Sequence, residues 1–340
     1  MLKFSDYMSL LFVGVVIIAL LVMPSNIANP YRKIDFETVT KSVVMVIPRQ
    51  KEYSEGGSMG TGFLIGDNLF MTNAHVVNSI LKKTPISVIP KDKLKLYDAV
   101  IVNIDTLSDI ALFKLTDKAW AEFKSEITDK TLPFATDKPA LGENVYTIGH
   151  PEGNTWTVAR GIISRLMVNN FTESSQGQMY YTQTDANIFR GNSGGPMLND
   201  RGEVIGMNSM MKQMTGGSLG FAIPSEILKR ISGDMLKYGH VRWSAFGIGL
   251  SWNDKGETVI KKVFPDSPAF GKLQENDIIV SMSDANRKEK IEYFEEVLHF
   301  VLFNHPGETV TFTVLRNGKS VNIPVVTAEK MSIEYIPPGE

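Results

Sequence analysis

The sequence predicts a mainly β protein of two globular domains, and three observations support this. At about 150 residues per domain, a chain of 340 residues is long enough for two. Residues 43–223 consist of short apolar runs separated by Gly, Asn, Asp and Pro, a pattern typical of many short strands in a barrel or a sandwich. Further strand-like runs follow residue 240 and predict a second, smaller β-rich domain.

Composition and charge exclude several classes of function. The chain has 35 basic and 37 acidic residues, so no overall field attracts nucleic acid or anionic lipid. It has no cysteine, which excludes disulfides, thiolate metal sites and thiol nucleophiles. No zinc, calcium or nucleotide-binding motif is present, and we therefore expect no metal and no cofactor.

The amino-terminal segment predicts a membrane helix. Residues 8–23 contain nothing more polar than Ser9 and Gly14, and a helix of this length spans about 24 Å. This is slightly short for a membrane span and slightly long for a signal peptide. Because residues 24–28 offer only a poor cleavage site, we favour an uncleaved anchor over residues 8–24, with a signal peptide as the alternative. Either segment would export the rest of the chain.

A helix is expected between the two domains. Ser225 is the predicted N-cap, an apolar stripe follows it, and Gly239 is the predicted end; the stripe is Ile227, Leu228, Ile231 and Leu236. In the second domain we expect one helix, over residues 290–303. The expected strands are residues 246–250, 258–263, 277–282, 309–316 and 319–326.

Three short segments of the first domain suggest chemistry when they are taken together. Alone, His75 could be a core histidine, Asp109 could cap a turn, and the glycine-rich residues 191–196 could form a tight loop. Together they supply a base, a carboxylate and a serine hydroxyl. A serine is a weak nucleophile until an imidazole accepts its proton, and a carboxylate must hold that imidazole in one tautomer. We predict these roles for Ser193, His75 and Asp109.

The glycines beside Ser193 predict an oxyanion hole. They allow backbone N–H groups to turn toward one point, and each such donor is worth roughly a hundredfold in rate. We expect this hole in the loop of Gly191, Asn192 and Ser193, with the N–H groups of Gly191 and Ser193 as donors.

These segments closely resemble the HtrA/Deg family of trypsin-like serine proteases. Residues 184–188 (TDANI) and 220–224 (GFAIP) extend the resemblance, which covers nearly the whole chain. One anchor, one protease domain and one PDZ domain are the arrangement of the DegS type within this family. The resemblance implies a trypsin-like double β-barrel over residues 36–240, with its active site between the barrels, and a small α+β PDZ domain over residues 243–329.

The resemblance also implies a peptide site and a specificity pocket. Phe246, Gly247 and Ile248 match the loop that binds a peptide's terminal carboxylate, beside a strand edge that pairs with the peptide. Ile188 and Met211 match positions of the pocket for the side chain before the cut, and their apolar character predicts a preference for Val, Ala or Leu.

Both assignments have ordinary structural alternatives. Gly247 and Gly249 could be strand glycines where backbones approach closely. Ile188 and Met211 could belong to the barrel core. The sequence also departs from the PDZ pattern, with Asn276 where the family usually has glycine, and with Asp284-Ala285 in place of a common Asn-Gly turn.

The function implied by the resemblance is that of a membrane-tethered serine endopeptidase in a bacterial periplasm. Its expected partners are protein or peptide substrates, carboxy-terminal peptides of misfolded envelope proteins at the PDZ domain, and two further copies in a homotrimer. Its expected role is stress sensing through cleavage of a membrane-bound regulatory protein. A general quality-control protease is one alternative, and an inert tethered peptide-binding scaffold is another.

Overall fold

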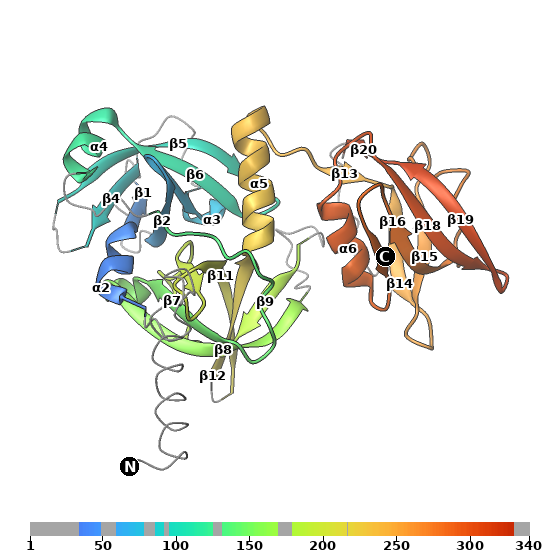
Figure 1. Cartoon of the computed structure of the whole chain (residues 1–340), viewed down its shortest axis with the longest axis horizontal. Coiled ribbons are helices and arrows are strands. Elements are labelled where there is room, and N and C mark those ends of the chain that lie inside the picture. The colour runs from blue at the N-terminus through green and yellow to red at the C-terminus, as the bar shows by residue number, and fades with distance from the viewer. Residues whose placement is uncertain are drawn as a thin grey trace, which may run out of the picture. The chain divides into compact units, whose positions relative to one another are not determined.

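The structure is a computed structural model that describes residues 34–48, 59–77, 86–91, 95–124, 131–168, 179–215 and 217–329 (Figure 1). The expected anchor over residues 8–24 lies outside these ranges. Within them, no helix has both the length and the apolar character needed to cross a membrane.

The first half of the larger, amino-terminal domain is a closed six-stranded barrel. Its strands follow each other around the barrel in the order β1-β2-β3-β6-β5-β4. Phe70 and Phe113 stack in its core with ring centroids 5.1 Å apart, and both side chains are fully buried. The elements are α2 (Phe36–Val39), η1 (Thr40–Ser42), β1 (Val43–Pro48), β2 (Gly60–Gly66), β3 (Leu69–Thr72), α3 (Ala74–Val77), β4 (Ile86–Pro90), β5 (Tyr97–Asp105), β6 (Ile110–Leu115) and α4 (Asp117–Lys124).

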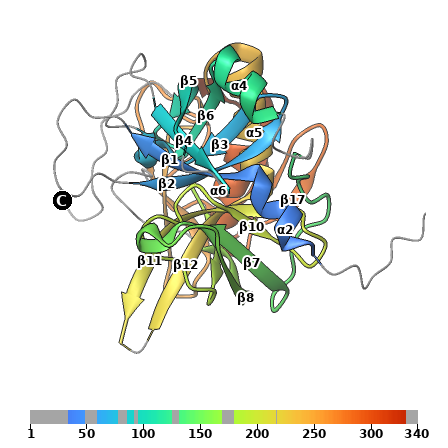
Figure 2. The same cartoon turned by 90° about the vertical axis from the view of Figure 1, so that its left-hand side faces the viewer.

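The second half is another closed six-stranded barrel, with the order β10-β11-β12-β9-β8-β7. Figures 1 and 2 show the two barrels as neighbouring bodies, each built from consecutive strands. The choice between barrel and sandwich that the strand pattern left open is thus settled in favour of two barrels. The elements are β7 (Asn144–Gly149), η2 (Pro151–Gly153), β8 (Thr157–Val168), β9 (Tyr181–Thr184), β10 (Pro196–Leu198), β11 (Val204–Met214) and β12 (Gly217–Pro224).

Helix α5 (Ser225–Tyr238) follows the second barrel, as predicted, and ends at Gly239 in a left-handed conformation (φ 77°). The predicted N-cap was wrong by one residue. Pro224 still pairs with Gly206 at the end of β12, so it keeps an extended backbone and Ser225 becomes the first helical residue. Leu236 was also wrongly placed in the apolar stripe: it is 56% exposed, and the adjacent Met235 is buried instead.

The carboxy-terminal domain packs helix α6 (Phe294–Leu302) against an antiparallel sheet of order β14-β15-β16-β18-β19. Phe246 meets Phe312 edge-on in its core, with centroids 4.8 Å apart. Three predicted strands are confirmed residue for residue, namely β15 (Thr258–Val263), β18 (Thr309–Arg316) and β19 (Lys319–Val326). The others are β13 (Ser244–Ala245), β14 (Ile248–Trp252), β16 (Ile278–Ser283), β17 (Lys288–Lys290) and β20 (Ala328–Glu329).

Several boundaries in this domain differ from the prediction: β16 is shifted by one residue to Ile278–Ser283, β14 ends two residues later and α6 ends one residue earlier than expected, and two starting points differ by more. Helix α6 begins four residues later than expected, because the preceding segment Lys288–Lys290 pairs with β16 as strand β17. Strand β14 begins at Ile248, two residues later than expected, because Gly247 adopts φ 72° and interrupts the extended backbone. Asn276 adopts φ 69°, a left-handed conformation that asparagine tolerates better than most residues. Asn276 can therefore adopt the positive φ that this position requires, for which related domains use glycine.

Candidate active site

His75 and Asp109 form a close pair on the first barrel. His75 lies in the short helix α3, and Asp109 lies in the turn between β5 and β6. The Asp109 carboxylate accepts hydrogen bonds from the His75 backbone N–H (2.9 Å) and from ring atom Nδ1 (2.9 Å). This arrangement places the proton on Nδ1 and leaves Nε2 as the atom that can accept a proton. Burial opposes protonation of the ring, but the hydrogen bond and negative charge of Asp109 prevail and raise the pKa of His75.

Ser193 comes from the second barrel and reaches the same place. Its hydroxyl donates to the backbone carbonyl of Ser209 at 3.1 Å, and the Ser209 hydroxyl donates to Asp109 Oδ2 at 2.8 Å. Ser209 on β11 therefore connects the serine to the His75–Asp109 pair. In the described part of the chain, no hydrogen bond joins the Ser193 hydroxyl to the His75 ring, which remains half exposed.

The loop around Ser193 requires its glycines. Gly191 has φ 98° and Gly194 has φ 83°, conformations that side chains other than glycine rarely adopt. A Cβ on Gly194 would lie 2.2 Å from the carbonyl oxygen of Thr61. The loop is also tied to its surroundings, because the Thr61 N–H donates to Ser193 O (2.8 Å) and the Gly194 N–H donates to Asn208 O (2.8 Å).

His150 is a buried histidine behind this loop. Its ring is fully inaccessible to solvent, with Nδ1 2.9 Å from the Thr61 hydroxyl and the edge of Trp156 packed against it (centroids 4.9 Å apart). Burial lowers the pKa of His150 to about 4, because it removes the hydration of the cation. The ring is therefore neutral at physiological pH.

The two residues expected to line a specificity pocket meet at Gly220. A Cβ on Gly220 would lie 2.6 Å from Ile188 Cδ1, and Met211 is paired with Gly220 across the β11–β12 ladder. Ile188 is buried, whereas Met211 is 37% exposed. The structure thus brings the pair together, and its apolar side chains could contact a substrate side chain or complete the barrel core.

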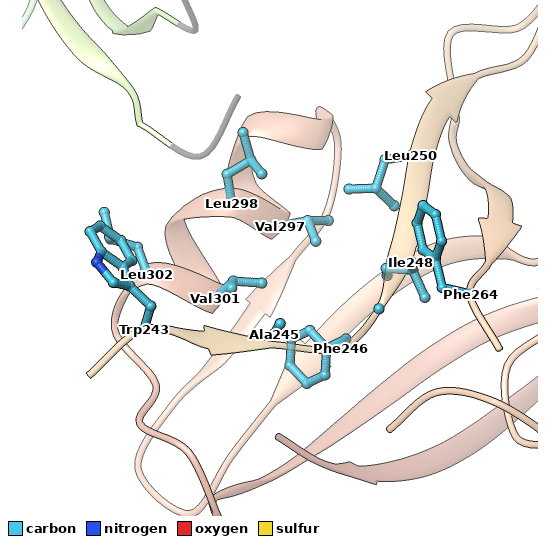
Figure 3. Close-up of a pocket in the computed structure, with 11 residues that line it drawn as sticks. Trp243, Ala245, Phe246, Ile248, Leu250, Phe264, Val297, Leu298, Val301 and Leu302 are labelled. Carbon is cyan, nitrogen blue, oxygen red and sulfur yellow. The ribbon is translucent and has the colours of Figure 1, made fainter. Parts of the chain in front are cut away.

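A second candidate site is a groove of about 140 Å³ between α6 and the strands β13 and β14 of the carboxy-terminal domain (Figure 3). The predicted residues Phe246, Gly247 and Ile248 line one end of it. The carbonyls of Phe246 and Gly247 are occupied by the N–H groups of Ala269 and Phe264. Since the C=O and N–H of a trans peptide point in opposite directions, the N–H groups of Gly247 and Ile248 point away from those partners.

Apolar side chains form the walls of this groove. Val297 and Val301 on α6 face Ile248 and Leu250 on β14, with Phe264 beside them (Figure 3). Gly247 lies between two strands and not within one, and a Cβ there would lie 2.1 Å from Ser267 Cβ. Gly247 is therefore not a strand glycine, but its contact with Ser267 agrees with the close approach that the alternative expected, and Gly249 does lie within β14.

Sequence reasoning missed several residues of both sites. Ser209, Thr61 and His150 contact the loop of Ser193 from three separate strands or turns, so no local spacing connects them. The α6 side of the groove was missed as well. The apolar residues of that helix at spacings of three and four were a usable signal, but the pattern alone does not separate a groove face from a core face.

Two closed barrels that together position a histidine, an aspartate and a serine on a glycine-lined loop define the trypsin-like class of peptidases. Comparison with protein families supports this class. The model of the trypsin-like peptidase domain matches residues 60–207, and that of the PDZ domain matches residues 244–327.

Individual known proteins that resemble this chain are serine endoproteases. The serine endoprotease DegS of Haemophilus influenzae is 30% identical over 281 residues, which cover 80% of this chain and 77% of the relative. The probable periplasmic serine endoprotease DegP-like of Chlamydia trachomatis is 32% identical over 83% of this chain and 56% of its own length. The crystal structure of the serine endoprotease from Yersinia pestis matches with a TM-score of 0.61, 27% identity, and coverage of 88% of this chain and 99% of that one.

The chain belongs to the HtrA/Deg family of serine endoproteases. The mainly β fold predicted from the sequence, a trypsin-like double barrel followed by one PDZ domain, is confirmed. The chain spans little more than half the length of several DegP-like relatives, at 56% and 54% of two chlamydial proteins.

The buried, neutral state of His150 predicts an acid-sensitive stability. In the unfolded chain a histidine takes up a proton near pH 6.5, but in the fold His150 does so only near pH 4. Its stabilising contribution is therefore complete above pH 6.5 and is lost as the pH falls toward 4. The lowered pKa of His150 therefore contributes about 3 kcal/mol to the free energy of unfolding at pH 7, relative to a pH below 4. Urea unfolding followed by tryptophan fluorescence at pH 7 and pH 4 should show a smaller loss of stability in His150→Asn than in the wild type.

The matched control is His240→Asn, because the His240 side chain is exposed. This variant should lose as much stability as the wild type over the same pH range. Equal losses in the wild type and in His150→Asn would contradict the account of His150.

Proposed function

We propose that the chain is a serine endopeptidase that cleaves peptide bonds through an acyl-enzyme on Ser193. The observation that carries this proposal is the hydrogen-bonded connection from Ser193 through Ser209 to Asp109, whose carboxylate also holds His75. It joins a hydroxyl of one barrel to an imidazole and a carboxylate of the other. Family membership supports the same activity.

The chemistry follows from the roles of these groups. His75 Nε2 accepts the Ser193 proton as Oγ attacks the scissile carbonyl, and it then delivers that proton to the leaving amine. Asp109 fixes the tautomer and stabilises the imidazolium, in keeping with the raised pKa of His75. For this step the Ser193 hydroxyl must exchange Ser209 O for His75 Nε2 as its partner, through a change of the Ser193 rotamer. The N–H groups of Gly191 and Ser193 bind the oxygen that becomes negative in the tetrahedral intermediate.

A fluorophosphonate probe tests the nucleophile directly, because it reacts with activated serines. Wild type should label at one site, Ser193→Ala should not label, and Asp109→Asn should label about ten-thousandfold more slowly because its His75 tautomer is no longer fixed. The matched control is Asp117→Asn, an exposed aspartate on α4 of the same barrel, which should label like wild type. Full labelling of Ser193→Ala would refute the assignment and would favour an inert scaffold with an unrelated reactive serine.

The finer part of our proposal concerns location and regulation. We propose that residues 8–24 tether a homotrimer to the inner membrane, with the protease and PDZ domains in the periplasm. Peptide carboxy-termini of misfolded envelope proteins would bind the groove and favour the active arrangement of the protease. The enzyme would then cleave a membrane-bound regulatory protein. The relatives named as periplasmic or as DegS support this location and role.

The contacts of α6 support a coupling between the groove and the protease. One face of this helix supplies Val297 and Val301 to the groove, while His299 lies 3.8 Å from Glu226 Oε1. Glu226 also accepts a hydrogen bond from the Tyr180 hydroxyl at 2.7 Å. Burial opposes ionisation of Glu226, but the nearby His299 ring and the hydrogen bond from Tyr180 prevail and lower the pKa of Glu226 to about 2.

Tyr180 directly precedes β9, and the chain runs from β9 to the loop of Ser193. A shift of α6 on peptide binding therefore has a short physical route to the active site. A peptide changes the protease only if it binds the active arrangement more tightly than the resting one.

Peptide titration tests this regulation. Peptides with a free carboxylate and an apolar last residue should bind the groove and raise the rate of cleavage of an unfolded reporter, because the groove walls are apolar and its end presents backbone N–H groups. The same peptides with an amidated carboxy-terminus should bind at least tenfold more weakly. Val301→Glu should abolish activation, whereas Val326→Glu, an exposed valine outside the groove, should not.

If the rate of reporter cleavage stays unchanged at saturating peptide, the proposed activation by peptide binding is wrong. The proposed peptidase activity is not affected by that result. Product analysis then separates the remaining alternatives. One or a few cuts in a folded partner indicate a regulatory protease, and exhaustive digestion of many unfolded proteins indicates a quality-control protease.

A further inference from the structure

The Thr61 side chain connects His150 to the loop of Ser193. Its hydroxyl oxygen lies 2.6 Å from the carbonyl oxygen of Gly191 and 2.9 Å from His150 Nδ1. Because a carbonyl can only accept, the single hydroxyl proton points to Gly191, and the hydroxyl must accept from His150 Nδ1–H. The order of donation is therefore from His150 to Thr61 to Gly191. All three residues are buried.

Thr61 also holds the loop through its backbone. Its N–H donates to the carbonyl of Ser193 at 2.8 Å, so this one residue bonds to both ends of the segment that carries the two expected oxyanion donors. The chain next to His150 fixes a further carbonyl, since the Glu152 N–H donates to Arg190 O at 2.9 Å.

These bonds determine which way the peptide groups beside Gly191 face. In a trans peptide the C=O and the following N–H point in opposite directions. The carbonyl of Arg190 is held toward Glu152, so the N–H of Gly191 is turned away from it. The carbonyl of Gly191 is held toward Thr61, so the N–H of Asn192 is turned the other way, where it donates to Phe189 O at 3.0 Å.

Close packing adds to this restraint. A Cβ on Gly191 would lie 2.1 Å from the carbonyl oxygen of His150, and a Cβ on Gly149 would lie 2.5 Å from Asn192 Oδ1. The segment Gly149–His150 and the loop are thus in direct contact over two residues each. His150 Nε2 has no hydrogen-bond partner within the described ranges, so the polar contact of this ring is the one to Thr61.

We infer that His150 is a positioning residue for the oxyanion hole: through the Thr61 hydroxyl it holds the Gly191 carbonyl, and so fixes the peptide group that lies between the two expected donors, the N–H groups of Gly191 and Ser193. This inference rests on the proposed peptidase activity. His150 and Thr61 are both fully buried and do not touch the substrate. Their effect is on the stabilisation of the oxyanion, and they should therefore change kcat and leave KM nearly constant.

The test uses the full-length chain and the rate of fluorophosphonate labelling, because the phosphoryl oxygen of the adduct occupies the position of the oxyanion. Thr61→Val removes the hydroxyl and should slow labelling about ten- to a hundredfold, somewhat less than the loss of a whole oxyanion donor. Thr61→Ser restores the hydroxyl and should recover most of that loss. The matched control is Thr147→Val, a buried threonine on β7 whose hydroxyl has no partner among the described residues.

A second pair of variants examines the histidine. His150→Phe should slow labelling about as much as Thr61→Val, whereas His150→Asn keeps an N–H donor near the Nδ1 position and should be less impaired. Because the two groups act in series, Thr61→Val combined with His150→Phe should be no slower than the slower single variant. With a peptide substrate, kcat should fall in both Thr61→Val and His150→Phe, and KM should change less than twofold.

The outcomes are distinct. Equal labelling of Thr61→Val and Thr147→Val, or a rise in KM in place of a fall in kcat, would overturn the inference and leave the peptidase assignment standing. If Thr61→Val does not fold, His150→Phe and His150→Asn decide the question by the same criteria. A wild type that labels no faster than Ser193→Ala would instead refute the proposed activity, and the inference with it.

Discussion

The carboxylate of Asp109 is the contact on which the geometry of the site depends. It accepts hydrogen bonds from the backbone and the ring of His75 on the first barrel, and from the Ser209 hydroxyl on the second. A single charged group therefore orients the imidazole and ties β11 of the other barrel to it. Taking such a carboxylate out of water is costly unless several donors satisfy it. The three donors explain how this charge is accommodated at the junction of two separately closed barrels.

The loop of Ser193 is the second requirement, and it depends on space as much as on hydrogen bonds. Gly191 and Gly194 adopt left-handed conformations in which a Cβ would meet a carbonyl oxygen, of His150 and Thr61 respectively. The loop can therefore approach the neighbouring backbone closely enough for Thr61 to donate hydrogen bonds to the carbonyls of Gly191 and Ser193. The N–H groups of Gly191 and Ser193, the proposed oxyanion donors, take no part in these bonds. In this account the preorganised donors are a property of packing around the loop, and the neutral, buried His150 contributes to that packing.

Much of this could be predicted from the sequence. His75, Asp109 and Ser193 each lie in a short segment of recognisable composition, and Gly239 and the strands β15, β18 and β19 follow from local rules of patterning and capping. Other features could not be predicted in this way. Ser209, Thr61 and His150 reach the site through strand register and barrel closure, which no local pattern records. Pro224 takes the N-cap position from Ser225 because β12 continues its ladder one residue further than the capping preference suggests.

The central claim of this account is that Ser193 is the nucleophile and that Gly191 and Ser193 supply the oxyanion donors. A crystal structure of the chain after reaction with a fluorophosphonate is its most direct test. The account predicts phosphorus bonded to Ser193 Oγ, with a phosphoryl oxygen about 2.7–3.1 Å from the backbone nitrogens of Gly191 and Ser193. An adduct on another serine, or a phosphoryl oxygen directed to solvent and away from both nitrogens, would contradict it.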